Sequence, residues 1–116
     1  MLHFRQTSIW QTIIQMTVQV YAFTKAFPDE ERFALTSQMR RAAISIGSNF
    51  AEGFGRKHTN DFAHFMTMAR GSVYELTAQV ELAKAVGYIH DTTECQELLE
   101  RIAYEFNCIL KAKNLE

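Results

Sequence analysis

Apolar side chains recur at three- and four-residue steps along almost the whole chain, and this period limits its fold more than any other feature. Only an α-helix places residues with this spacing on one face. The chain has a single proline, Pro28, and no run of alternating apolar and polar residues of the kind that indicates a β-strand. The pattern therefore predicts an all-α protein.

Breaks in the pattern divide it into four segments, at about residues 8–26, 36–55, 59–86 and from 91 onward. Gly87 is placed to end the third segment in a left-handed conformation, and Asp91 with Glu94 resembles a capping box at the start of the fourth. Candidate N-caps of the first three helices are Ser8, then Thr36 or Ser37, and Thr59 or Asn60. Four helices with short connections pack most readily as an antiparallel up-down four-helix bundle.

Each segment has a face that we expect to point into the core. The expected inward residues are Ile9, Ile13, Met16, Val20, Phe23 and Phe27, then Met39, Ala43, Ile46 and Phe50, then Phe62, Phe65, Ala69, Val73, Leu76, Val80 and Ala83, and finally Cys95, Leu98, Leu99, Ile102, Phe106 and Ile109. On the fourth helix Glu97, Glu100, Arg101 and Glu105 are expected to face outward.

The length of 116 residues predicts one domain over residues 1–116. The uncharged run from Gln6 to Thr24 is nearly long enough to cross a bilayer, but glutamines at every fourth position give it a polar stripe. That pattern is typical of a helix outside the membrane. The start of the chain does not resemble a signal peptide, so we expect a cytoplasmic protein. Cys95 and Cys108 are too far apart on one helix to bridge, and free buried thiols are expected.

Polar residues in the middle of the second segment are unusual for a helix that otherwise looks buried. Arg41, Ser45, Ser48 and Glu52 share one stripe, with Asn49 beside it. On the third segment Ser72, Glu75 and Gln79 form a similar run. We expect the two stripes to face each other as a structural polar network, with Arg41 paired to Glu52 or Glu75. Such networks fix register or partner choice more than they add stability.

A catalytic pair formed by Glu52 and Glu75 is the alternative interpretation of these stripes. The sequence provides no nucleophile, acid partner or phosphate loop to accompany it, so we predict a protein without catalytic residues. His58, Asp61 and His64 share one edge of the third helix, which is too few ligands for a metal site. The "GFGR" stretch at 53–56 lacks the third glycine and preceding strand of a phosphate loop. No metal or cofactor is therefore expected.

Arg40, Arg56, Lys57 and Arg70 are candidates for a modest basic patch that contacts nucleic acid. The formal net charge of −1 provides little counterion-release drive, which favours a solvated surface instead. Repetition of the patch in an oligomer would strengthen a weak site.

Two long stretches resemble a known family: "LTSQMRRAAISIGSNFAEGFGR" at 35–56 and "DFAHFMTMARGSVYELTAQVELAKAVGYI" at 61–89. They are similar to the four-helix-bundle proteins named after intervening sequences of bacterial 23S rRNA genes. The likeness runs from "IWQ" near the start to "GYI". In that family a proline is usual where this chain has Gly47, and an isoleucine where it has Phe50.

The resemblance implies a bundle that assembles into a ring, typically a homopentamer, with the second helix serving both its own core and a neighbouring subunit. Related accessory proteins of diversity-generating retroelements work beside a reverse transcriptase and are strongly basic, unlike this near-neutral chain. We expect a non-enzymatic scaffold that forms a homo-oligomer and presents a surface to a protein or RNA partner. The alternative is an RNA-binding accessory protein that uses the basic patch directly.

Overall fold

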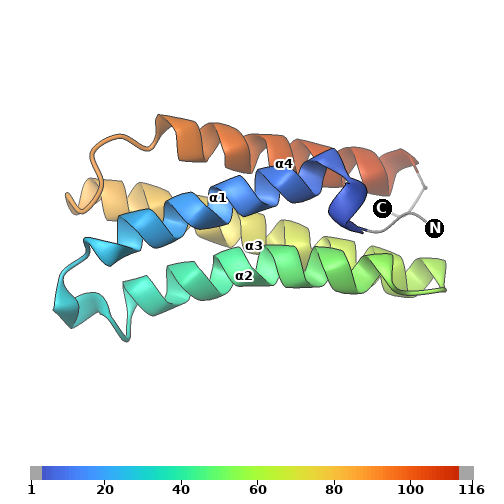
Figure 1. The fold of residues 1–116 in the computed structure, drawn as a ribbon, viewed down its shortest axis with the longest axis horizontal. Helices are drawn as coiled ribbons and strands as arrows, with labels where there is room; N and C mark the ends of the chain where they lie inside the picture. The colour runs from blue at the N-terminus through green and yellow to red at the C-terminus, as the bar shows by residue number, and fades with distance from the viewer. Residues whose placement is uncertain (1–3, 113–116) are drawn as a thin grey trace.

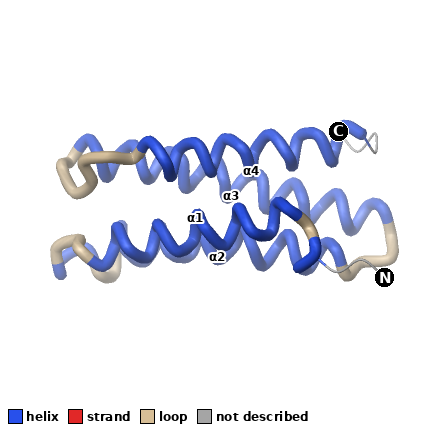
Figure 2. The backbone as a smooth tube through the Cα atoms, turned by 45° about the horizontal axis from the view of Figure 1, so that its top comes forward, coloured by secondary structure: helices blue, strands red, loops and turns tan. Residues whose placement is uncertain are grey.

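The computed structural model describes residues 4–112, and within that range all regular secondary structure is helical (Figure 1). Figure 2 shows that loops are confined to the ends of the long helices. The long helices are α1 (Ser8–Lys25), α2 (Leu35–Phe54), α3 (Thr59–Ala85) and α4 (Thr93–Ala112), and the short 3-10 turns are η1 (Phe4–Gln6) and η2 (Asp29–Glu31). The prediction of four helices with these approximate limits is confirmed.

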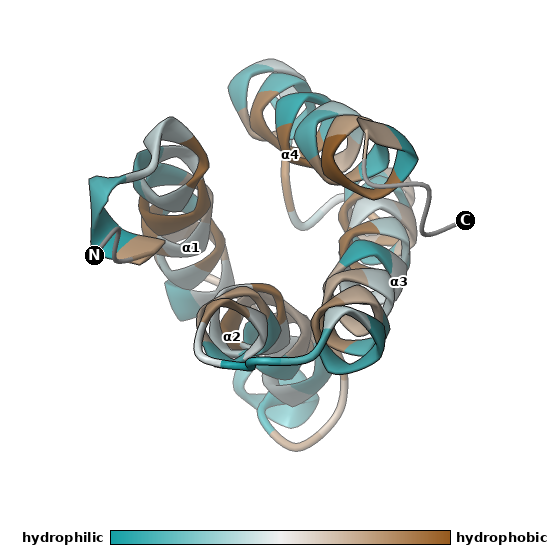
Figure 3. Ribbon diagram, turned by 90° about the vertical axis from the view of Figure 1, so that its right-hand side faces the viewer, coloured by the Kyte–Doolittle hydropathy of each residue, from teal (hydrophilic) through white to brown (hydrophobic). Residues whose placement is uncertain are grey.

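The four long helices form an elongated bundle, with principal extents of 43 × 24 × 24 Å. Viewed from its end, α1, α2, α3 and α4 follow one another around the bundle, and each packs on its two neighbours (Figure 3). The most extensive contact is between α2 and α3. No helix between residues 4 and 112 is long and apolar enough to cross a membrane.

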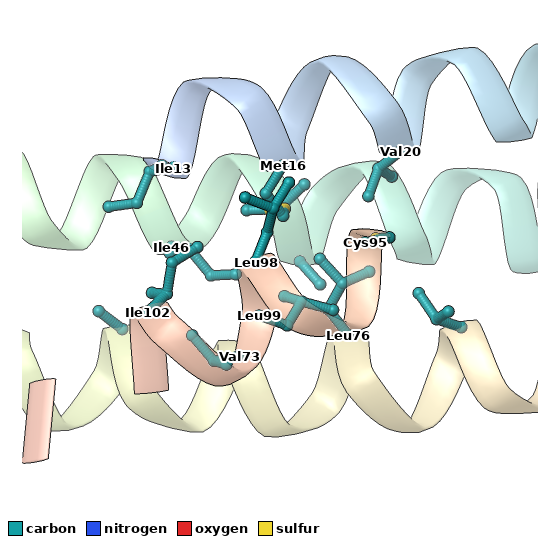
Figure 4. Close-up of a cluster of buried hydrophobic side chains, with 14 of the residues drawn as sticks. Ile13, Met16, Val20, Ile46, Val73, Leu76, Cys95, Leu98, Leu99 and Ile102 are labelled. Carbon is teal, nitrogen blue, oxygen red and sulfur yellow. The ribbon is translucent and has the colours of Figure 1, made fainter. Parts of the chain in front are cut away.

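The core lies along the bundle axis and contains side chains from all four helices (Figure 4). Most of the expected inward residues are buried there, so the helical-period prediction is confirmed for them. On α4, however, Leu110 is fully buried while Ile109 is only partly buried. Glu105 is also partly buried instead of facing outward. Phe23, Phe62 and Phe65 are likewise only partly buried.

The helix starts differ from the predicted caps by one or two residues. Thr7, not Ser8, caps α1, because its hydroxyl accepts a hydrogen bond from the Trp10 N–H at 3.3 Å. At the start of α2 the N-cap is Ala34, which has no side chain that can accept. α3 begins at Thr59 after His58, whose side chain makes no capping hydrogen bond.

The turn between α3 and α4 is the one that the sequence indicates. Gly87 has a φ of +91°, which favours glycine. Its N–H donates to the Lys84 carbonyl at 3.0 Å, and the Tyr88 N–H donates to the Ala83 carbonyl at 2.9 Å, which together make a Schellman motif. The predicted capping box of Asp91 with Glu94 is wrong: α4 begins at Thr93, and Asp91 accepts from the Thr93 N–H at 3.0 Å. This bond is the main reason that the pKa of Asp91 is lowered.

The two cysteines are free, as expected, but only one is buried. Burial raises the pKa of the Cys95 thiol to about 11, which keeps it protonated. Cys108 is exposed, contrary to the expectation that both thiols are buried.

Candidate functional site

The close contact between α2 and α3 depends on Gly53, which lies in the "GFGR" stretch. A Cβ placed on this buried glycine would lie 2.6 Å from Met66 Cε and 3.0 Å from Phe65 Cβ. The Met66 methyl group ends a flexible side chain and can move aside, but the Phe65 Cβ is attached to the backbone, so a larger residue would require α3 to shift by a few tenths of an ångström. Gly53 therefore serves packing between helices and not the binding of a phosphate.

Part of the predicted polar network forms in the same α2–α3 contact. The hydroxyls of Ser45 and Ser72 lie 2.9 Å apart. The Asn49 side-chain amide donates to both the Ser45 carbonyl and the Ser45 hydroxyl, each at 2.9 Å. These three side chains satisfy one another where two helices meet, as a structural network should.

The other members of the predicted network lie elsewhere. Arg41, Ser48, Glu52 and Glu75 are exposed in the monomer. Gln79 is buried, and its Oε1 has no hydrogen-bond partner within residues 4–112. The expected pairing of Arg41 with Glu52 or Glu75 is absent from this part of the chain, where the ion pair formed by Glu52 is with Arg56, at 3.6 Å.

The contacts of α2 with α3 also separate the two glutamates of the alternative catalytic pair. Ser45 meets Ser72, and Gly53 lies against Phe65, so residue numbers fall along α3 as they rise along α2. Glu52 and Glu75 consequently lie on opposite sides of the serine contact, separated by roughly 15 Å at a rise of about 1.5 Å per residue. That distance is too large for two carboxylates to act on one substrate atom.

The predicted basic residues do not form one patch. Arg40 and Arg56 are both on or next to α2 and lie roughly 24 Å apart along it. Arg56 lies with its guanidinium 4.8 Å from the centre of the Phe65 ring, and Lys57 is exposed in the adjoining loop. Arg70 donates to the Asn107 side chain at 2.8 Å, which ties α3 to α4.

Among residues 4–112 no group of three histidine, cysteine, aspartate or glutamate side chains could hold a metal ion. His58, Asp61 and His64 are all exposed around the start of α3. As the spacing predicts, the three residues lie along one edge at the start of α3. Within the described chain, no facing helix adds a further ligand to them.

An apolar groove runs between α1 and α2, on the side of α2 away from α3. Its volume is about 330 Å³. Three of its apolar side chains are largely exposed: Ile14 at 39%, Val18 at 63% and Ile44 at 49%. The full lining is Trp10, Ile13, Ile14, Thr17, Val18, Ala43, Ile44, Gly47, Ser48 and Ala51. We call this the apolar groove.

The sequence contained a signal for this groove that our interpretation did not use. Ile14, Val18 and Tyr21 follow each other at four- and three-residue steps, beside the predicted core face of the first helix. A second apolar stripe on a helix that already has a core face indicates a surface for another contact.

A second groove lies at the start of α2, and it is rich in arginine and aromatic side chains. Its volume is about 570 Å³. Arg40 lies 4.6 Å above the Tyr21 ring, and Arg32 lies 5.1 Å above the Phe33 ring. The lining is Tyr21, Arg32, Phe33, Thr36, Ser37, Arg40, Arg41, Ile44 and Ser45. We call this the arginine groove; it shares Ile44 with the apolar groove.

The loop before the arginine groove is attached to the α3–α4 turn. The Tyr88 hydroxyl donates to Glu31 Oε2 at 2.8 Å, and the Phe27 and Tyr88 rings lie 5.1 Å apart. The hydrogen bond to Glu31 is the main reason that the pKa of Tyr88 is raised. Both turns lie at the same end of the bundle in Figure 1, opposite the α2–α3 loop.

These features define a four-helix bundle that has a tightly packed α2–α3 pair and an apolar surface along α1 and α2. The model of the 23S rRNA-intervening sequence protein family matches residues 5–109. The chain belongs to this family, as the resemblance implied. No curated protein matches the chain.

Proposed function

We propose that the protein is a non-enzymatic scaffold that associates with copies of itself through the apolar groove. In this proposal the chain is an antiparallel up-down bundle, and copies of it close into a ring, with five subunits as the resemblance implies. It acts in the cytoplasm and presents a repeated surface to a partner. The observation that supports the proposal most strongly is the exposed apolar lining of the groove.

The composition of the groove favours a protein neighbour. Ile14, Val18 and Ile44 stand together on one face, where a monomer would expose them to water. Exposed apolar clusters of this kind mark interaction surfaces. Gly47 and Ala51 leave room between these side chains for a neighbour to insert its own.

Further apolar side chains are exposed on α3 and at its C-cap, away from the groove: Tyr74, Leu82 and Val86 are 54%, 60% and 62% exposed. Insertion of one of these side chains into the groove of the next subunit would make a head-to-tail contact. Contacts of this type give a closed ring when the rotation between neighbours divides a full turn.

The test is to place a charge in the groove and to measure the mass of the particle. Val18→Asp should break the assembly into single 13.4 kDa chains, because a carboxylate cannot be buried unpaired in an apolar interface. Gln15→Asp is the matched control, since it adds the same charge at an exposed position of α1 outside the groove lining. Light scattering after size-exclusion chromatography reads the mass of each.

Wild-type protein with the mass of one chain at micromolar concentration would contradict self-association. If Val18→Asp and Gln15→Asp assemble equally well, the apolar groove is not the interface. Circular dichroism should show the same helix content in both variants, because Val18 is largely exposed and its replacement leaves the core intact.

RNA binding at the α2–α3 loop is the second candidate function. It is favoured by a small pocket of about 170 Å³ that Arg56, Lys57, His58, Thr59 and Phe62 line. Affinity for structured RNA that falls steeply with salt, and that is lost when Arg56 and Lys57 are both changed to Glu, would support it. If no RNA binds at low salt while the oligomer persists at high salt, the RNA-binding function is contradicted and the scaffold function is supported.

A further inference from the structure

The arginine groove is large enough to hold a small ligand, and neither proposed function uses it. Its volume of about 570 Å³ lies within the range of about 300–1,000 Å³ that is usual for small-molecule sites. It lies at the opposite end of α2 from Arg56 and Lys57, so it is separate from the candidate RNA surface.

The positive charge in this groove is not neutralised by neighbouring carboxylates. Arg32, Arg40 and Arg41 all line it, and none of them makes an ion pair with another residue of the described chain. Glu31, the acid next to Arg32, makes no ion pair with it: one of its oxygens accepts from the Tyr88 hydroxyl at 2.8 Å and the other from the Leu35 N–H, at the start of α2, at 3.4 Å. The groove therefore favours an anion.

At the start of α2 only the first N–H, that of Leu35, has a side-chain acceptor among the described residues, which is Glu31 Oε1 at 3.4 Å. Ala34 at the N-cap position offers no side-chain acceptor. The N–H groups of Thr36 and Ser37 have no acceptor between residues 4 and 112. Free N–H groups and the positive end of the helix dipole bind phosphate groups well.

The Thr36 side chain is an independent indication of a ligand. It is only 8% exposed, it lines the groove, and no hydrogen bond is formed by its hydroxyl within the described chain. By contrast, Thr12, Thr17, Thr24 and Thr77 each donate to the carbonyl four residues earlier. The Thr36 hydroxyl is not one of the side-chain oxygens that are buried without a partner, so it is reached from the groove and can donate to a bound acceptor there.

Aromatic side chains supply the other half of the site. Phe33 is 87% exposed and packs against no core residue. Arg40 is held in place, since its Nε donates to the Thr24 hydroxyl at 2.8 Å and its guanidinium lies over Tyr21. This leaves its two terminal nitrogens for a ligand. The Arg32 guanidinium lies over one face of the Phe33 ring, and the other face is a platform on which a nucleobase can stack.

We propose that the arginine groove binds a nucleotide, with its phosphate on the open start of α2 and the arginines, and its base on Phe33. The ligand is either a free nucleotide or the 5′-phosphorylated end of an RNA strand, because both present the same phosphate and base. This site goes beyond the proposed scaffold, and its occupancy is measured independently of particle mass.

The experiment is calorimetric titration of the full-length protein with AMP, adenosine and inorganic phosphate at low salt. AMP should bind, while adenosine and inorganic phosphate should each bind at least about tenfold more weakly, since each lacks one half of the ligand. Arg41→Gln, Thr36→Val and Phe33→Ala should each weaken AMP binding by about tenfold, as expected for one lost charged hydrogen bond or one lost stacking contact. Arg56→Gln with Lys57→Gln is the control, since it removes charge from the other end of α2.

Thermal melts should show that the variants are folded; Phe33 and Arg41 are exposed, and valine preserves the volume of Thr36. A five-nucleotide RNA, with and without a 5′-phosphate, identifies the source of the ligand. Tighter binding of the phosphorylated strand than of AMP supports an RNA end, and the reverse supports a free nucleotide. Absence of AMP binding, equal affinity for AMP and inorganic phosphate, or AMP affinity that the three groove variants leave unchanged would overturn the proposal.

Discussion

α2 meets α3 on one side and α1 on the other, and small residues have opposite effects on the two sides. Toward α3, Gly53 and the Ser45–Ser72 pair bring the helices so close that a methyl group at Gly53 would crowd Met66 and Phe65. Toward α1, Gly47 lies 3.4 Å from Trp10 and Ile13, at ordinary contact distance, measured from a Cβ placed on the glycine. The first contact is closed and the second leaves the apolar groove.

The difference arises from what lies opposite each small residue. Phe65 presents its Cβ and Phe62 its backbone carbonyl to Gly53, and such atoms cannot move aside without shifting the helix. Trp10 and Ile13 present the ends of side chains to Gly47. A small residue therefore draws two backbones together only if the opposing surface is itself close to a backbone.

The largest expected effect comes from filling the closed contact. Gly53→Ala should gain about 1 kcal/mol of helix propensity but lose about 1–3 kcal/mol through overpacking against Phe65 and Met66. We expect a net decrease of about 1 kcal/mol in the free energy of unfolding. Urea denaturation at fixed chain concentration, followed by circular dichroism, measures it, and an unchanged or increased stability would show that the contact is looser than described.

The next effect tests the polar part of the same contact. Ser45→Ala removes the hydroxyl that Ser72 and Asn49 share, and we expect a loss of about 1 kcal/mol in the free energy of unfolding. Ser48→Ala makes the same chemical change at an exposed position of α2. The control should alter stability by less than about 0.5 kcal/mol; equal effects in both variants would assign the loss to helix propensity alone.

The smallest effect, and the opposite in sign, is expected on the open side. Gly47→Ala should increase the free energy of unfolding by about 0.5–1 kcal/mol, because the helix gains propensity and the new methyl group makes ordinary contacts. Gly71→Ala is the reference, since no atom lies within 4 Å of a Cβ placed there. A thermal shift clearly lower for Gly47→Ala than for Gly71→Ala would show that the α1–α2 side is also closed.

The sequence predicted the helices and most of the core because both depend on local periodicity. The Gly87 turn was predictable for the same reason, since a left-handed cap needs only the residues around it. Cap positions such as Thr7 instead of Ser8 were missed by one residue, because neighbouring hydroxyls satisfy the same pattern.

The candidate sites could be predicted only in part, because they depend on how far each helix is rotated and shifted against its neighbour. Spacing placed Ser45, Asn49 and Glu52 in or beside one stripe of α2, but only Ser45 is hydrogen-bonded to α3, and Asn49 is bonded to Ser45. Likewise, Arg40 lies on α2 and Arg56 just after it, and the length of the helix separates them. The arginine groove was missed because Arg32 and Phe33 come from a loop that has no period.

The closed side of α2 also explains why the two helices pack in a single alignment. Sliding α2 by one turn toward its C-terminus, about 5.4 Å, would bring Asn49 to the place where Gly53 lies close to Phe65. Rotating it would separate the Ser45 and Ser72 hydroxyls. One glycine thus fixes the position of α2 along its axis, and one serine pair fixes its rotation. The side chains of α2 that border the two grooves therefore keep one position relative to α3.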